Sequence, residues 1–454
     1  MLKCVQSTLN RIDSPPGIRW FAPALDRAWN CSARRQPRAL VMALASLSAI
    51  LVVSSCSTTF APPQTGGAAA GALNVGSDSH VVVMEYEAWF GPNAMNFRNV
   101  PSKPALQSPD MEALGGGYDS ADPAVIQQHV SWLEAIGVDA ALIEVTNNVS
   151  CIFNSQWFID TYLPNCTPSF RSSNWTIRDN TGNLYPAWNS LGTKLKLIPM
   201  VGGVDNDVLY PDQDGTTALE REIGYFGGLL QRYPNLSVIY LGKPLMIVFL
   251  GAAQDPNAAD NPLWYQIEMF LRGHPDIANK YTFRFMAGYL DSQPGLWQSP
   301  KSPTAPVQIS SAYGFWSWVD RLNTGCAISG CPYYPSYNRT GSRVENFTVS
   351  LATDGAEGGW GCPNPNSAPY CPDDSLRFGN DPNQSYVTFN PFMTYAKQLN
   401  PIFLIVHQFN EFTPPDEGFD ANSNDDVEPA SLWGTGALTN VQQQIQAYRQ
   451  TVGP

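Results

Sequence analysis

Eight short apolar runs of similar length recur along this chain, and they constrain its fold more than any other feature. Helical patterns lie between several of them, and the clearest begins at Asp122–Pro123, where Asp is a typical N-cap and Pro a typical first helical residue. Eight buried strands that alternate with helices favour a (β/α)8 or TIM barrel over an open sheet. The expected strands are 80–85, 139–145, 195–201, 244–250, 282–287, 307–315, 346–352 and 402–409, and further helices are expected at 217–232, 262–272, 385–399 and 438–451.

The last apolar run ends abruptly in polar side chains. Ile402 to Val406 reads as a strand buried on both faces. His407, Gln408, Asn410 and Glu411 follow it. Barrels of this kind keep their chemistry at the carboxyl ends of the strands, where a carboxylate beside an amide suits acid–base or nucleophilic work on a sugar. The alternative is a strand that merely runs into a polar loop.

Composition narrows the class of ligand. The 454-residue chain has a formal net charge of −13 and only 26 Lys and Arg, which argues against a nucleic acid partner. Its 13 Trp and 19 Tyr are many, and flat rings of this kind stack on sugars, although most of them pack in a core. We therefore expect a carbohydrate substrate, no nucleic acid, and a monomer.

The N-terminal segment has the pattern of an export signal. Arg34, Arg35 and Arg38 precede an apolar run over 39–53, which is too short for a membrane-spanning helix, since such a helix needs about 20 residues. Val53-Ser-Ser-Cys56 resembles a bacterial lipobox, in which Cys56 carries lipid. We expect a leader over 1–56, a flexible tether over 57–79 and one barrel domain over 80–454, exported and attached to the cell envelope or surface through the lipid.

Six cysteines follow Cys56 and fall into close pairs. An even number in local pairs predicts disulfides that staple loops in an exported protein, and the spacing without nearby His does not suit zinc. The pairs are Cys151 with Cys166, Cys326 with Cys331, and Cys362 with Cys371.

Several motifs resemble one enzyme family in the same order along the chain. Leu114-Gly-Gly-Gly-Tyr-Asp-Ser-Ala-Asp-Pro-Ala-Val-Ile126 is similar to the first βα unit of the barrels of glycoside hydrolase family 99, which includes endo-α-mannosidases. Tyr86-Glu-Ala-Trp-Phe-Gly91 is similar to the family's first strand, and Gln408-Phe-Asn-Glu-Phe412 with Val427-Glu-Pro429 to its last. The resemblance implies a barrel and a glycan site over most of 81–450.

In that family two Glu residues, three positions apart, catalyse the reaction. The first corresponds to Glu411 here, whereas Pro414 occupies the second position and shifts the next acids to Asp416 and Glu417. Glycoside hydrolysis uses two carboxyl groups. We expect Glu411 to act as base or nucleophile and Glu417 or Asp416 as acid.

Other polar and aromatic residues follow the expected strands and are candidates for substrate binding. For Glu87 and Glu144, which are also competing catalytic partners, the alternative is a buried acid bonded to Asn or Tyr, and for His407 it is a core histidine. For the Trp residues the alternative is packing. The candidates are Tyr86, Glu87, Trp89, Glu144, Asn147, Trp316, Trp318, His407 and Asn410.

We expect no cofactor and no metal in the site. One acidic stretch alternates oxygen ligands and resembles a calcium loop, but it lacks the Gly and distal Glu of an EF-hand, so a solvated acidic loop is the preferred interpretation. Its candidate ligands are Asp420, Asn422, Asn424 and Asp426.

The sequence therefore predicts a surface-anchored glycoside hydrolase. The alternative is a non-catalytic glycan-binding or surface-assembly lipoprotein on a degenerate barrel, which the displaced second carboxylate would favour. Two carboxyl groups facing each other across the site favour hydrolysis.

Overall fold

The computed structural model describes most of the chain beyond residue 70. The described ranges are 71–98, 102–203, 206–250, 263–287, 312–317, 337–352, 388–412 and 424–453, with 296–297, 307–308 and residue 386. They belong to one compact unit. The predicted leader, Cys56 and most of the predicted tether lie outside these ranges.

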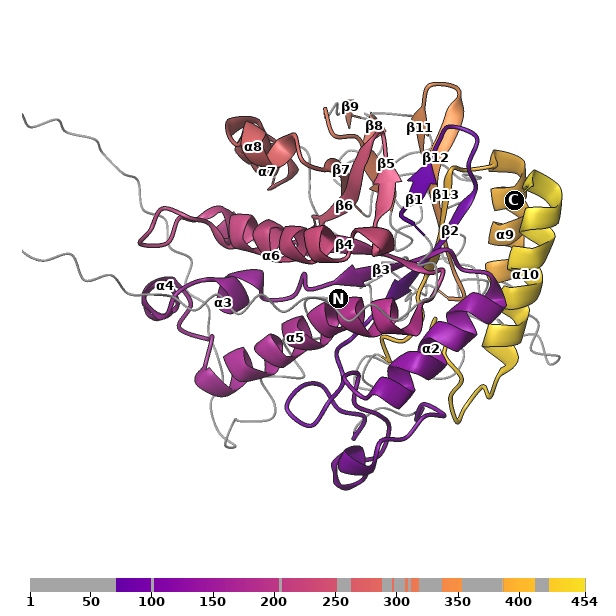
Figure 1. Ribbon diagram of the computed structural model, residues 1–454, viewed down its shortest axis with the longest axis horizontal. Coiled ribbons are helices and arrows are strands. Elements are labelled where there is room, and N and C mark those ends of the chain that lie inside the picture. Colours follow the sequence, from indigo (N-terminus) through magenta and orange to yellow (C-terminus); the bar gives the residue numbers. More distant parts are fainter. Residues whose placement is uncertain are drawn as a thin grey trace, which may run out of the picture. The chain divides into compact units, whose positions relative to one another are not determined.

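Eight strands form a continuous parallel sheet in the order expected of a (β/α)8 barrel (Figure 1). In space the order is β10, β7, β6, β4, β3, β2, β13, β12, so each strand lies beside its neighbour in sequence and the last strand pairs with the first. The bounds are β2 Val81–Tyr86, β3 Ala140–Glu144, β4 Lys196–Gly202, β6 Lys243–Phe249, β7 Thr282–Ala287, β10 Phe315–Ser317, β12 Arg343–Ser350 and β13 Phe403–His407. This confirms the predicted fold class.

The two end strands of this sheet, β10 and β12, are joined by side chains. Trp316 of β10 donates from Nε1 to a carboxylate oxygen of Glu345 on β12, at 3.1 Å. Arg284 of β7 forms an ion pair with the same carboxylate at 2.7 Å. No backbone ladder joins β10 to β12 within the described ranges. We call this group of contacts the seam of the barrel.

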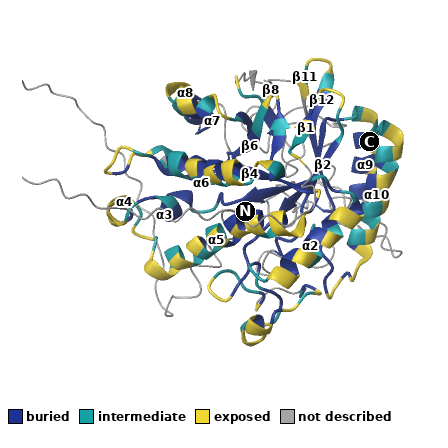
Figure 2. Ribbon diagram, in the orientation of Figure 1, coloured by how far each residue is buried: buried dark blue, intermediate teal, exposed yellow. Residues whose placement is uncertain are grey.

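Alternate residues of each strand face two different layers. On β2, Val81 and Val83 pack with residues of the other strands in the barrel interior, whereas Val82 and Met84 pack against the surrounding helices. On β13, Ile405 faces the interior in the same way. Figure 2 shows the strands buried and the helices exposed only on their outer sides. The strands are therefore apolar throughout because both of their faces are covered.

The helices begin where capping side chains satisfy their first backbone amides. Asp122 accepts from the amide of Ala124 at the start of α2, and Thr217 from that of Glu220 at the start of α6. The longer helices are α2 Pro123–Ile136, α5 Pro168–Leu191, α6 Ala218–Arg232, α7 Leu263–Gly273, α9 Phe389–Leu399 and α10 Gly436–Val452. Short helices are α3 Val149–Phe153, α4 Gln156–Tyr162, α8 Pro275–Ala278, η1 Pro109–Leu114, η2 Asn206–Leu209 and η3 Pro234–Leu236. Four of the longer helices match the predicted ranges 217–232, 262–272, 385–399 and 438–451, with α9 beginning later than expected.

Two predicted boundaries differ most from the observed ones. The sixth barrel strand begins at Phe315 rather than Val307, because Gly314, with φ of 74°, takes a left-handed conformation just before it, and 307–308 instead belongs to a small hairpin. The tether does not extend to residue 79, because β1 (Leu73–Val75) pairs in parallel with β5 (Val238–Tyr240). The remaining strands are β8 Leu296–Trp297, β9 Val307–Gln308 and β11 Tyr337–Thr340.

Within the described ranges, no helix has the length and apolarity needed to span a membrane.

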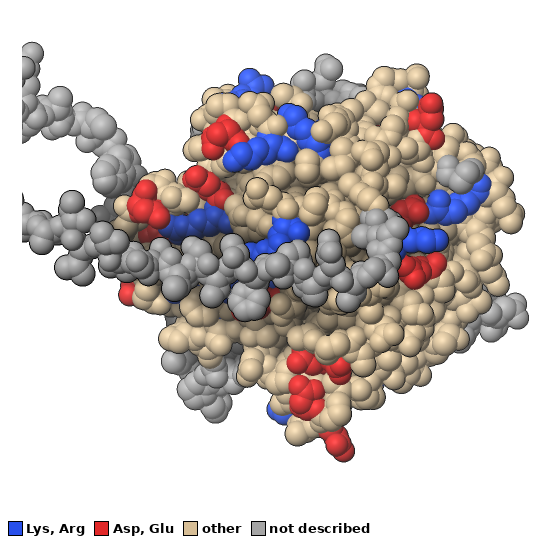
Figure 3. Space-filling model, in the orientation of Figure 1, with Lys and Arg blue, Asp and Glu red and all other residues tan. Residues whose placement is uncertain are grey.

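The visible surface has few charged side chains. Figure 3 shows Lys and Arg scattered beside Asp and Glu, with uncharged residues covering most of this face. Several acidic residues of the chain are instead buried, among them Glu85, Glu87, Glu144, Glu222 and Glu428. Their location defines the site described next.

Candidate active site

Strand register places a row of polar side chains at the carboxyl end of the barrel interior. Val406 of β13 pairs with Met84 of β2, so His407 and Glu85 come next to each other. Nδ1 of the His407 ring contacts a carboxylate oxygen of Glu85. On its other side, His407 pairs with Ser350 of β12. Residues far apart in sequence thus meet because three parallel strands end together.

The register between β2 and β3 likewise places two carboxyl groups side by side. Tyr86 of β2 pairs with Ile143 of β3, so Glu87 comes beside Glu144. Burial, followed by the charges of Glu144, Glu85 and Glu411, raises the pKa of Glu87 well above its ordinary value. Burial also raises the pKa of Glu144, although hydrogen bonds from Thr146 oppose this shift. Both shifts favour the protonated form of these buried carboxyl groups.

Glu411 follows β13 and lies in the same region. It is 6% exposed, and its carboxylate contacts the side-chain amide nitrogen of Gln408. Burial raises the pKa of Glu411 to about 7, and the charge of Asp425 acts in the same direction, whereas the Gln408 hydrogen bond lowers it. The backbone amide of Glu411 donates to Asp426 at 2.6 Å and fixes the loop. A carboxyl group with this pKa can donate or accept a proton near neutral pH.

Asp425 lies beside Glu411, and the sequence analysis assigned it no role. Its carboxylate accepts from Ser350 Oγ at 3.1 Å, contacts His407 Nε2 at 3.3 Å and accepts from Gln408 Nε2 at 3.4 Å. Its side chain is 17% exposed, so solvent reaches it more readily than it reaches Glu411. From the sequence, the acidic stretch around Asp425 was considered only as a possible calcium loop. Nothing in the sequence shows that this stretch folds back onto β12 and β13.

A buried amide fixes the loop after β13 to the end of β2. Asn410 donates to the backbone carbonyl of Glu87 and accepts from its backbone amide, both at 2.9 Å. Asn410 Nδ2 also donates to Tyr118 Oη at 2.9 Å. Asn410 is fully buried. It therefore positions Glu87 through the backbone.

Three further buried side chains extend this network toward helix α2. Tyr118 donates to Glu428 at 2.8 Å, and Glu428 lies 3.3 Å from Nε2 of His129. The other ring nitrogen of His129 lies 2.9 Å from Tyr86 Oη. Burial, followed by the charges of Glu428 and Glu87, raises the pKa of Tyr86 above its ordinary value. Tyr86 was expected to contact a sugar, and the structure places its ring in this buried network.

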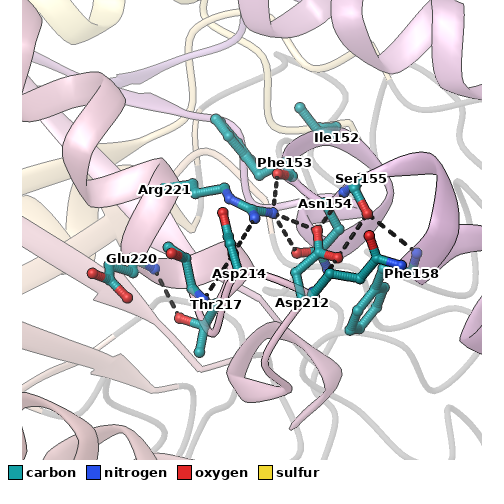
Figure 4. Close-up of polar contacts among 12 residues, drawn as sticks. Ile152, Phe153, Asn154, Ser155, Phe158, Asp212, Asp214, Thr217, Glu220 and Arg221 are labelled. Carbon is teal, nitrogen blue, oxygen red and sulfur yellow. Dashed lines mark hydrogen bonds and ion pairs between the residues drawn. The ribbon is translucent and has the colours of Figure 1, made fainter. Parts of the chain in front are cut away.

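A separate polar cluster holds the loops that follow β3 and β4 (Figure 4). Asp212 accepts from the backbone amide and hydroxyl of Ser155, both at 2.6 Å, and forms an ion pair with Arg221 of α6 at 2.8 Å. Burial acts to raise the pKa of Asp212, but these hydrogen bonds hold it below its ordinary value. Arg221 also donates to the backbone carbonyl of Phe153 at 3.0 Å and pairs with Asp214. The cluster thus fixes α3 and α4 against α6 at the strand ends.

The remaining predicted substrate contacts are more dispersed. Trp89 is 2% exposed, and Trp316 is fully buried in the seam, where its indole bonds Glu345. Asn147 is half-buried in the loop after β3. Asp416, Glu417 and Trp318 lie outside the described residues. The structure brings together Glu87, Glu144, His407, Asn410 and Glu411 from the predicted set.

The predicted disulfides and the calcium alternative are described only in part. Cys151 and Cys166 form a disulfide, while Cys326, Cys331, Cys362 and Cys371 lie outside the described residues. Asp426 accepts from the Glu411 and Phe412 amides and from Asn424, and Asp420 and Asn422 lie outside the described residues. No cluster of three or more metal-ligating side chains occurs in the part of the chain that the structure describes. The solvated acidic loop stays the prediction for this stretch, with calcium binding as its alternative.

Comparison with known proteins adds structural similarity at low sequence identity. No protein-family model and no curated protein matches the sequence. An endo-α-mannosidase of glycoside hydrolase family 99 from Bacteroides thetaiotaomicron is similar at 12% identity and a TM-score of 0.45, over 82% of this chain and 98% of that one. A glycoside hydrolase-like protein is similar at 12% identity and a TM-score of 0.37, over 81% of this chain and 94% of that one. An α-L-fucosidase from Paenibacillus thiaminolyticus is similar at 10% identity and a TM-score of 0.32, over 83% of this chain and 75% of that one. The site is therefore interpreted from its own geometry.

Proposed function

We propose that this protein is a glycoside hydrolase whose central residue is Glu411. The observation that carries the proposal is the position of Glu411, a buried carboxyl group with a pKa of about 7, among other carboxyl groups at the strand ends of a (β/α)8 barrel. Active sites of this fold lie at that face. Hydrolysis of a glycosidic bond uses two carboxyl groups held in different protonation states.

The raised pKa supports a role for Glu411 as general acid. From the sequence and the general chemistry of glycoside hydrolysis, Glu411 was expected to act as base or nucleophile. A carboxyl group that keeps its proton near neutral pH can deliver it to the leaving oxygen of a glycosidic bond, whereas an ordinary carboxylate cannot. The aromatic content and the scarcity of cations support a neutral glycan as the substrate class.

Release of reducing sugar tests this function. The full chain, purified in detergent, is incubated with a panel of α- and β-linked polysaccharides beside Glu411→Gln, which keeps the shape of the side chain but cannot deliver a proton. Activity in the parent that falls by at least about 10²-fold in the variant supports the proposal. Asp416→Asn and Glu417→Gln, measured in parallel, test the acids suggested by the sequence.

The alternative is glycan binding without catalysis. Affinity electrophoresis of the same two proteins in gels containing each polysaccharide measures it. Retarded migration of both proteins, with no sugar released by either, would contradict the hydrolase and establish the binding function.

We further propose that the protein is exported and anchored to the cell envelope or surface through lipid on Cys56. The lipobox-like Val53-Ser-Ser-Cys56 supports this proposal. Mass spectrometry of the mature N-terminus should show diacylglycerol on Cys56 in the parent. Cys56→Ser should remain unprocessed, and an unlipidated mature parent chain would contradict the anchor.

A further inference from the structure

We propose that Asp425 is the second catalytic carboxyl group of this site, positioned by His407 and Glu85. The inference rests on the proposed hydrolase function and names the partner of Glu411. Neither the spacing of the motif at 408–412 nor the acids at 416 and 417 point to this residue.

The first argument is that Asp425 and Glu411 contact the same atom. Nε2 of Gln408 contacts one carboxylate oxygen of Glu411 and lies 3.4 Å from Oδ1 of Asp425. The two carboxyl groups therefore lie on either side of one buried amide. Both retain some exposure, 6% for the Glu411 residue and 17% for the Asp425 side chain.

The second argument is that the two carboxyl groups have different surroundings. Asp425 is contacted by Ser350 Oγ, His407 Nε2 and Gln408 Nε2, each of which can donate a hydrogen bond. The opposite nitrogen of the His407 ring contacts Glu85. The His407 ring therefore lies between the carboxyl groups of Glu85 and Asp425 and directs its Nε2 at Asp425. Glu411, by contrast, has its pKa raised by burial.

A third observation points to a ligand between them. The side chain of Gln408 is almost fully buried, and within the described part of the chain its carbonyl oxygen Oε1 has no hydrogen-bond donor. An unsatisfied buried acceptor costs about 1–3 kcal/mol. A sugar hydroxyl bound beside the two carboxyl groups would supply the missing donor. Gln408 therefore both separates the two acids and recognises a polyhydroxyl substrate.

Glu87 and Glu144 are less suitable partners. They are 0% and 1% exposed, so both are closed off from the surface more completely than Glu411 and Asp425. A carboxyl group that is closed off from the surface cannot reach an anomeric carbon.

The chemistry follows from these environments. Glu411 gives its proton to the glycosidic oxygen as the bond from that oxygen to the anomeric carbon breaks, and the bonding electron pair stays with the oxygen. A water oxygen bonds to the anomeric carbon, and Asp425 accepts the proton that this water loses. One water is consumed for each bond broken, and proton exchange with solvent then restores both acids.

Chemical rescue distinguishes a catalytic Asp425 from a structural one. Asp425→Ala should lower kcat by at least about 10²-fold on an aryl glycoside that the parent cleaves. Sodium azide, a small anion that fits the space left by the side chain, should restore turnover and give a glycosyl azide. The neighbouring Asp426→Ala is the matched control, because Asp426 holds the Glu411 and Phe412 amides and azide should not rescue its loss.

The outcomes separate this inference from the proposed function. An active parent whose Asp425→Ala variant loses less than about tenfold in kcat, or loses activity that azide does not restore, overturns the role of Asp425 alone. A parent that hydrolyses no glycan or aryl glycoside overturns the hydrolase and this inference together. Azide rescue confined to Asp425→Ala supports both.

His407→Gln tests the positioning role. This variant should lower kcat with little change in KM, because the ring contacts Asp425 rather than the substrate, and azide should leave it unchanged. A kcat equal to that of the parent would show that His407 does not position Asp425.

Discussion

Replacing Glu345 by Leu should destabilise the barrel more than any surface change, because Glu345 joins the two strands at the seam. Its carboxylate accepts from Arg284 Nε at 3.0 Å and Nη2 at 2.7 Å, from Tyr240 Oη at 2.7 Å and from Trp316 Nε1 at 3.1 Å. Glu345 is 2% exposed, so water cannot replace it. The variant leaves a buried guanidinium and two buried donors without their acceptor.

The expected loss of unfolding free energy follows from the groups that lose their acceptor. Removing one partner of a buried ion pair costs about 3–5 kcal/mol, because the remaining charge stays desolvated. Arg284 keeps hydrogen bonds to the carbonyls of Phe283 and Tyr313, at 2.8 and 2.9 Å, which favours the lower end of that range. The double variant Glu345→Leu with Arg284→Met removes both charges and leaves only two neutral donors without an acceptor. It should therefore be more stable than Glu345→Leu alone.

Urea unfolding followed by tryptophan fluorescence measures these free energies. The matched control is Asp179→Asn, which breaks the exposed ion pair between Arg178 and Asp179 and should cost less than about 1 kcal/mol. A loss below about 1 kcal/mol for Glu345→Leu would refute the reasoning. A double variant less stable than Glu345→Leu would also refute it, because the unpaired charge of Arg284 would then not be the cause of the loss.

Three further predictions concern the site and its supporting loops. The folded pKa of Glu411, about 7, lies above its ordinary 4.5, so the folded state binds more protons between these pH values and stability falls as pH rises through this window. The unfolding free energy of Glu411→Gln, measured with urea, should therefore exceed that of the parent by up to about 3 kcal/mol at pH 8. This difference should disappear below pH 4. Cys151→Ser opens a disulfide with a sequence separation of 15, and it should lower the unfolding free energy by about 3 kcal/mol, a difference that reductant abolishes. Gly117→Ala should lower the melting temperature, because Gly117 has φ of 84° and an added Cβ would lie 2.1 Å from the Phe97 ring; an unchanged melting temperature would contradict this.

The sequence predicted the strands because a barrel strand is buried on both faces. Continuous apolar runs such as Ile402–Val406 follow directly from that burial, and the expected boundaries of β2, β4 and β7 differ from the observed ones by no more than one residue. Helix α5 was not predicted, although it is the longest described helix. Its sequence contains Asn, Gly and Pro186, which disfavour helices, and burial of Leu184, Tyr185 and Trp188 against the barrel stabilises it instead.

Only those residues of the site that directly follow a strand could be predicted from the sequence. Glu87, Glu144, His407 and Glu411 follow apolar runs, so the rule that parallel strands end on one face brings them together. Asp425 follows no strand, and only its position against β12 and β13 reveals it. Glu345 was missed for another reason. The register between β11 and β12 shifts from Asn338 paired with Asn346 to Arg339 paired with Val344, so Glu345 is skipped and its side chain turns into the barrel, which no alternation pattern shows.

The two groups of buried acids differ in their partners, and this difference separates structure from function. Glu345 is neutralised by Arg284, as expected for an acid that contributes to the fold. Burial is the largest cause of the raised pKa values of Glu87, Glu144 and Glu411, and at Glu411 it outweighs the opposing charge of His407. Burying acids whose charge is not neutralised by a paired Lys or Arg costs free energy that apolar side chains at the same positions would not cost. A fold gains nothing from this arrangement, whereas a reaction that needs one protonated and one ionised carboxyl group requires it.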